Sequence, residues 1–138
     1  PILLTKGSTK IALWGIGHVK ELRLNRALES ESIRWNRPLG IDGEPDPSYF
    51  NLFVIHQNKY KGMNFREGKR DSITRDSLPA WLDLVVWGHE HECIPEIETC
   101  EQTNVCFLQP GSTAPTSLCE AEQKTKHCFV LRVTEQNF

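Results

Sequence analysis

Apolar residues in this chain gather in short runs separated by turn-forming segments, and two of the runs end next to a histidine. Residues 51–55 (NLFVI) precede His56, and a run over 82–87 precedes Gly88 and His89. Both runs are rich in β-branched and aromatic residues, which favours buried strands. Residues 10–15 (KIALWG) alternate apolar with polar positions, and this pattern predicts a third strand.

The pattern changes to a helical repeat over residues 19–29, and this predicts a helix of about three turns. Its outward face would present Lys20, Arg23 and Arg26. A short helix is expected at Asp76-Ser77-Leu78-Pro79, where a capping residue precedes a proline. Further strands are expected over 33–38, 93–98, 105–109 and 126–134, the middle two antiparallel, with loops over 39–48 and 59–75. Strands that alternate with helical segments indicate the α/β class.

Charge is distributed unevenly behind a net charge of −2. Residues 1–40 carry seven basic and three acidic side chains, residues 57–75 carry six and two, and residues 81–102 carry six acids without Lys or Arg. The basic segments could form a phosphate-facing side. An ordinary solvated surface would have the same composition, so both interpretations stay open.

The chain of 138 residues has the length of one domain, and no apolar run approaches the ~18 residues of a membrane span. It shows no signal peptide, and its first residue is Pro rather than Met, which suggests a fragment. The five cysteines include no C-x-x-C pair, so we expect reduced thiols of an intracellular protein. Cys106 and Cys128 lie inside apolar runs, and we expect both to be buried.

His56, His89 and His91 are the candidate chemical groups. If the two strands are neighbours, all three imidazoles lie at one edge of the sheet, where open α/β sheets bind their ligands. Imidazole is a ligand for Zn, Mn and Fe. Three imidazoles and a water could form a mononuclear zinc site. A two-metal site would need bridging carboxylates, and no D-x-H or G-D pair after a strand supplies them. A lone histidine is more often an ordinary polar group than a ligand.

Several segments together resemble one known family. They are KGSTKIALWGIG, RLNRAL, FNLFVIHQN, LDLVVWGHEHEC, QPGST-x-x-TSL and KHCFVL, in this order and over nearly the whole chain. Each is weak alone, but the ordered set resembles the meiotic recombination eleven nucleases of double-strand-break repair, whose bacterial counterpart is SbcD. These are calcineurin-like metallophosphoesterases, with two mixed sheets flanked by helices. The SLSPGEA-like turn of the family is SLCEAEQ here, which puts the local turn geometry in doubt.

The resemblance implies a manganese-dependent DNA nuclease with two Mn²⁺ ions per complete site. By position, His56 and His89 would ligate one ion and His91 the other. The Asp-x-His, bridging Asp and catalytic His of the family have no match in residues 1–138. The chain therefore resembles the second half of the phosphoesterase domain, with the first half and the capping domain absent, and we expect little nuclease activity from it alone. The resemblance also implies DNA and an SMC-like ATPase as partners, a homodimer and a nuclear location.

Other residues have weaker assignments. Gln57 and Asn58 could orient His56 by hydrogen bonds, or could simply be polar turn residues. Lys20, Arg23 and Arg26 could contact DNA phosphates. Glu90 and Glu92 alternate with the histidines, so we expect them to point away from the metals. Two other functions stay open: a phosphoprotein or nucleotide phosphatase of the same fold, and a non-catalytic fragment that binds a partner.

Overall fold

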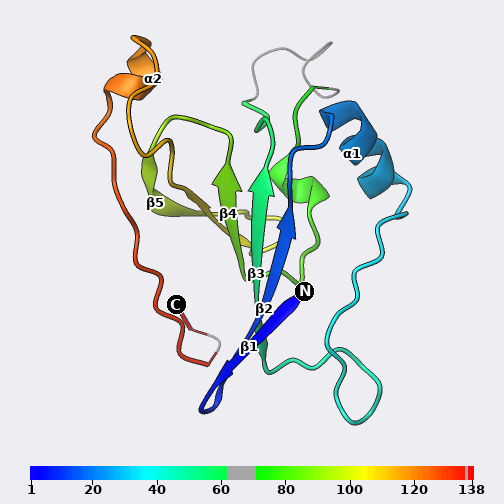
Figure 1. Ribbon diagram of the computed structural model, residues 1–138. Helices are drawn as coiled ribbons and strands as arrows, with labels where there is room; N and C mark the ends of the chain where they lie inside the picture. Colours follow the sequence, from blue (N-terminus) through cyan, green and yellow to red (C-terminus); the bar gives the residue numbers. More distant parts are fainter. Residues whose placement is uncertain (62–70, 136) are drawn as a thin grey trace.

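One mixed β-sheet organises residues 1–61, 71–135 and 137–138, which are the residues that the computed structural model describes (Figure 1). The four central strands run parallel, and each edge strand is antiparallel to its neighbour. Across the sheet the order is β1 (Ile2–Lys6), β2 (Thr9–Ile16), β3 (Tyr49–His56), β4 (Leu84–Gly88), β6 (Cys106–Gln109) and β5 (Ile94–Thr99). The helical elements are α1 (Glu21–Glu29), the 3-10 turn η1 (Arg75–Ser77) and α2 (Glu120–Gln123).

The main predicted elements are confirmed. The strands expected over 10–15, 51–55 and the run after 81 are β2, β3 and β4, and the expected helix is α1. β5 and β6 form the expected antiparallel pair, with an irregularity in register between Ile94 and Glu98. The predicted α/β class is therefore correct for a mixed sheet with few helices. None of the helices in the described ranges has the length and apolar content to cross a lipid bilayer.

The core lies on both faces of the sheet, because successive side chains of a strand point to opposite faces. The larger cluster is built on Phe53, Ile55, Val85, Trp87 and Phe107, and α1 adds Leu24 to it. The smaller cluster, on the opposite face, contains Phe50, Leu84 and Leu108, and Val133 of the C-terminal segment packs against it. Burial on both faces explains why β3 and β4 are almost continuously apolar.

The strand predicted over residues 33–38 is wrong. This segment is described throughout and pairs with no strand. Its alternating Ile33 and Trp35 are instead partly buried against the larger core cluster. The Trp35 ring packs edge-on against Phe53 and Trp81, with ring centroids 5.6 and 5.5 Å apart. Side-chain burial against aromatic rings therefore produced the pattern that usually indicates backbone pairing.

Two further predictions at the element level are wrong. Residues 126–134 form no strand. The segment passes along the sheet, and within the part of the chain that the structure describes its Thr134 forms an isolated bridge to Asn137. The helix expected from Asp76 is the single turn η1, which ends when Leu78 becomes extended.

Cys128 is exposed and Cys106 is half-buried, so neither is the buried residue that was expected. The sequence pattern did not predict β1 or α2.

Candidate metal centre

The register of the sheet brings His56 and His89 together. β2, β3 and β4 are parallel neighbours, so their carboxyl ends meet at one edge, at the top of Figure 1. His56 pairs with Gly88, and His89 is the next residue. Nδ1 of His89 lies 3.3 Å from Nε2 of His56, and the rings meet edge to face with centroids 5.1 Å apart. The sequence-based expectation that two strands deliver imidazoles to one point is therefore correct for this pair.

Backbone features at the end of β4 make this approach possible. A Cβ at Gly88 would lie 3.2 Å from Nδ1 of His56 and 3.2 Å from the Ile55 carbonyl oxygen, which is closer than most side chains tolerate. His89 has a φ of 78°, in the left-handed region that non-glycine residues rarely adopt. The chain therefore turns sharply directly after β4, where the two imidazoles meet.

The geometry of the two imidazoles fits two ligands of one cation. Nitrogens that each bind a metal at about 2.0–2.1 Å are roughly 3.3 Å apart when their bonds make a tetrahedral angle. The observed separation is 3.3 Å. However, the described part of the chain contains no group of three His, Cys, Asp or Glu side chains that could hold a metal. The three-imidazole zinc site that the spacing left open is therefore not formed, and the pair needs further donors.

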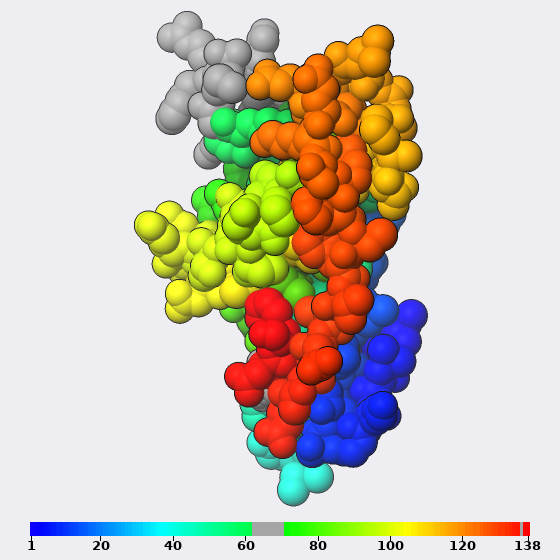
Figure 2. All heavy atoms as spheres, turned by 90° about the vertical axis from the view of Figure 1, so that its left-hand side faces the viewer, coloured from blue at the N-terminus to red at the C-terminus, as the bar shows by residue number. Residues whose placement is uncertain are grey.

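His91 lies in a separate hydrogen-bond network. Its side chain is 55% exposed, and its Nδ1 is 2.5 Å from Oε1 of Glu122 and 3.1 Å from the Thr116 hydroxyl. Lys126 donates a hydrogen bond from Nζ to the His91 carbonyl oxygen at 2.8 Å. Figure 2 shows the orange segment around α2 running beside the yellow-green segment after β4. Residues far along the chain thus hold the loop that follows β4, residues 88–93, which is named the GHEH loop.

Glu122 is the buried centre of this network. It accepts hydrogen bonds from Lys126, Thr116 and Ser112, in addition to its contact with His91. The bond from the Lys126 ammonium, followed by those from Thr116 and His91, holds the pKa of the Glu122 carboxyl far below its usual range. The carboxylate is therefore ionised at neutral pH. The sequence-based reasoning missed this residue, because only a contact across 31 positions links it to His91.

Gln57 and Asn58 make their side-chain hydrogen bonds to the segment around the start of α1. The Gln57 amide donates to the Gly17 carbonyl oxygen at 3.3 Å, and Asn58 donates to Glu21 at 3.0 Å. Within the described ranges these are the hydrogen bonds that the two amide NH₂ groups donate, and the His56 ring accepts neither of them. They hold the β3 end against the chain that follows β2.

His18, which was not selected as a site residue from the sequence, also lies beside the pair. Its ring stacks near that of His89, with centroids 6.2 Å apart and planes 22° apart. The available signal was its position, two residues after β2, which ends beside β3. Each of three adjacent parallel strands thus ends in a histidine or is followed by one within two residues.

The basic and acidic segments partly neutralise one another. Lys59 lies 3.0 Å from Glu98, Lys61 lies 2.7 Å from Glu90, and Arg75 also lies 3.2 Å from Glu98. Residues 62–70, which hold much of the predicted basic loop, lie outside the described residues. Glu92 pairs with Lys124. Glu90 and Glu92 therefore both contact lysines, while their orientation relative to a bound metal stays a prediction.

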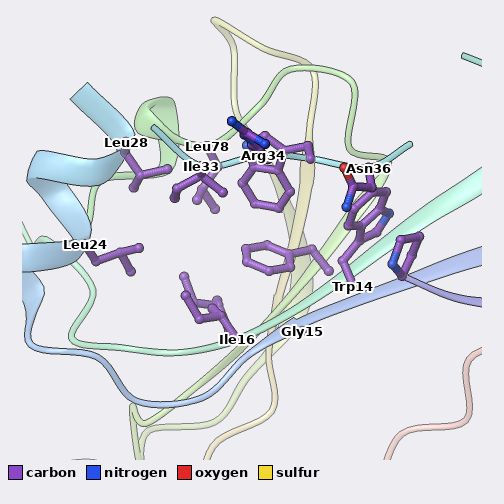
Figure 3. Close-up of a pocket in the computed structure, with 13 residues that line it drawn as sticks. Trp14, Gly15, Ile16, Leu24, Leu28, Ile33, Arg34, Asn36 and Leu78 are labelled. Atoms are coloured by element: carbon purple, nitrogen blue, oxygen red, sulfur yellow. The ribbon is translucent and has the colours of Figure 1, made fainter. Parts of the chain in front are cut away.

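Lys20, Arg23 and Arg26 are all exposed, at or on α1. α1 also borders an apolar pocket of about 260 Å³ (Figure 3). Its lining includes Trp14, Leu24, Leu28, Ile33 and Leu78, and no His, Cys, Asp or Glu is among the lining residues. This pocket is thus unsuited to bind a metal, and the candidate centre stays at the carboxyl edge of the sheet.

Comparison with known proteins relates this chain to double-strand break repair proteins. No family model matches the chain. It is 43% identical over 133 residues to the human double-strand break repair protein MRE11 and 38% identical over 134 residues to the Arabidopsis thaliana protein of the same name. It is 36% identical over 138 residues to the double-strand break repair protein mus-23 of Neurospora crassa. These matches cover 96–100% of the chain but 18% of each relative. The resemblance seen in the sequence is thus confirmed: over nearly its whole length, the chain is homologous to one segment, about a fifth, of the MRE11 double-strand break repair proteins.

Proposed function

We propose that this chain supplies metal ligands to a manganese-dependent DNA nuclease of double-strand break repair. The observation that supports this most directly is the 3.3 Å separation of His56 Nε2 and His89 Nδ1 at the carboxyl edge of the sheet. His56 and His89 would hold one Mn²⁺, and His91 would hold the second. The family relatives are repair proteins by name, which agrees with a DNA substrate.

Two bound cations would polarise the phosphodiester and offset charge on its oxygens. The residues of this chain would fix their positions. His56 and His89 would each present a neutral ring nitrogen from a rigid strand end, and the tight turn at Gly88 and His89 would keep the two rings together. The donors that complete both sites would come from outside the described group of residues.

The proposal extends to the surroundings of the site. Lys20, Arg23 and Arg26 would contact DNA phosphates, because all three are exposed and α1 follows the strand next to β3. The sheet would form one layer of a metallophosphoesterase sandwich. By resemblance, an SMC-like ATPase and a second copy would be the protein partners, and the nucleus the location.

A second candidate is a non-catalytic module that binds a partner protein. It is favoured by one observation, namely that the described residues bring together two metal-binding side chains and not three. A phosphatase of the same fold would have the same ligands, so the choice of substrate must separate it from a nuclease.

The proposal is tested by exchange. This chain replaces the matching segment of its human relative, and the product is assayed with Mn²⁺ on duplex DNA ends and on a phosphomonoester. We expect cleavage of DNA that is lost after His89→Ala or His91→Ala, with folding retained by circular dichroism. Cleavage that persists in both variants would exclude these residues from the site, and turnover of the phosphomonoester alone would indicate a phosphatase. A folded but inactive exchange product would favour the partner-binding module.

A further inference from the structure

Glu122 is a buried carboxylate that the proposed function does not use. It is 2% exposed, although it lies on the four-residue helix α2 near the surface. Burial of a carboxylate is costly unless hydrogen bonds compensate for the lost water. Oε2 accepts bonds from Lys126 Nζ at 2.8 Å and from the Ser112 hydroxyl at 2.9 Å. These two bonds stabilise one oxygen and leave Oε1 to interact elsewhere.

Oε1 faces the imidazole of His91. The oxygen lies 2.5 Å from Nδ1, and it also accepts a hydrogen bond from the Thr116 hydroxyl at 2.7 Å. The Thr116 oxygen is itself 3.1 Å from Nδ1. Since that hydroxyl gives its hydrogen to Glu122, it can offer only a lone pair to the ring. An ionised carboxylate likewise only accepts.

Nδ1 of His91 therefore has two acceptors and no donor among these partners. It can satisfy them only by carrying a hydrogen. A neutral imidazole carries one hydrogen on its two nitrogens, so Nε2 keeps a free lone pair. A metal ligand must present such a lone pair, and in proteins the opposite ring nitrogen commonly donates to a carboxylate.

We propose that Glu122 is a positioning residue, which holds His91 in the tautomer with hydrogen on Nδ1 and so leaves Nε2 as its ligating nitrogen. The tautomer follows from the hydrogen bonds alone, whereas the ligation rests on the proposed function. Lys126 and Ser112 fix the carboxylate, and both also bind the His91 carbonyl oxygen, Lys126 through Nζ and Ser112 through its backbone N–H, so one cluster orients the backbone and the ring together.

The Glu122→Gln substitution separates this role from a purely structural one, because the two predict different tautomers of His91. In Glu122→Gln the amide keeps the size of the side chain, but its oxygen must face the Lys126 ammonium, because an NH₂ group there would oppose another donor. The NH₂ group then faces Nδ1 and donates to it. The hydrogen of His91 should therefore move to Nε2, while a structural role requires no change of tautomer.

The test is long-range proton–nitrogen NMR of the histidine rings in the metal-free chain, at a pH where His91 is neutral. We expect Nδ1–H in the wild type and Nε2–H in Glu122→Gln. Glu120→Gln, an exposed position on the same helix, is the matched control and should keep Nδ1–H. Nε2–H in the wild type, or an unchanged tautomer in Glu122→Gln, would overturn the inference. The wild-type spectrum alone shows which nitrogen of His91 carries the hydrogen, so the inference can be refuted even if Glu122→Gln does not fold.

A second readout separates this inference from the proposed function. In the hybrid of this chain with its human relative, Glu122→Gln should raise the Mn²⁺ concentration for half-maximal DNA cleavage by about 10–100-fold, and Glu120→Gln should leave it unchanged. A hybrid that cleaves no DNA, together with a chain that shows the expected tautomer, would refute the proposed function and leave the role of Glu122 in setting the tautomer intact. An equal Mn²⁺ dependence of the hybrid and its Glu122→Gln variant would refute the role of Glu122 in ligation.

Discussion

Gly111 supports the GHEH loop from the segment after β6, and its replacement by Ala should both strain and displace this loop. Its φ of 74° lies in the left-handed region. An added Cβ would lie 2.7 Å from the Cys93 nitrogen, 2.8 Å from the His91 carbonyl oxygen and 2.9 Å from the Cys93 Cα. All three are backbone atoms, so a change of side-chain rotamer cannot relieve the contact.

The cost of Gly111→Ala has two parts. A left-handed conformation costs an L-residue about 1–2 kcal/mol, and overpacking of a well-packed region costs typically about 1–3 kcal/mol. The matched control is Gly43→Ala, because Gly43 has a φ of 81° but open space around its Cβ position. The control should therefore show the cost of the left-handed conformation without the cost of overpacking. The free energies of unfolding of the two variants should differ by about 1–3 kcal/mol.

Urea unfolding followed by tryptophan fluorescence measures this difference, provided that the dependence of the free energy on urea is the same in both variants. The His91 ring signals should also shift in Gly111→Ala and stay unchanged in Gly43→Ala. If both variants lose the same stability within about 0.5 kcal/mol, the close approach of Gly111 to the GHEH loop does not exist in solution.

Three further changes test the fold and its electrostatics. Phe53→Ala should lower the free energy of unfolding by about 3–5 kcal/mol in urea, because the ring is 3% exposed; a loss below 1 kcal/mol would contradict its place in the core. Asp83→Ala should cost about 1–3 kcal/mol by the same assay, because Asp83 accepts two hydrogen bonds from the buried Asn51; an unchanged midpoint would argue against them. The pKa of Glu98 is lowered by its hydrogen bond from Lys59, so Glu98 should stabilise the fold above pH 4.5 and lose this effect as the pH falls toward its folded pKa. In Glu98→Gln, stability should depend less on pH below 4.5, and an identical acid-unfolding profile would refute the pairing.

Local periodicity predicted those parts of the fold whose burial is local. β3 and β4 are buried on both faces, and α1 buries one side, so each leaves a clear pattern. β1 leaves none, because all five of its residues are exposed and it is defined by pairing with β2. The strand predicted over residues 33–38 shows the opposite error. There, packing of Ile33 and Trp35 imitates a strand without any pairing.

One part of the candidate site could likewise be predicted from the sequence, and another part could not. The meeting of His56 and His89 could be predicted, because it requires only that two apolar strands be parallel neighbours. The separation of His91 from that pair could not, since it depends on Glu122, which lies on a four-residue helix without any periodic pattern. The ion pairs between the basic segment and the acidic one could not be predicted either, because composition shows which charged residues exist but not which of them form pairs.

The shared cation site is tested most directly by Mn²⁺ binding to the hybrid of this chain with its human relative, in a double-mutant cycle of His56→Ala and His89→Ala followed by the EPR signal of free Mn²⁺. If the two imidazoles hold one cation, each single substitution should weaken binding nearly as much as both together, because removal of one ligand leaves the other with little to contribute. Losses that simply add, or an affinity that neither substitution changes, would contradict the shared site.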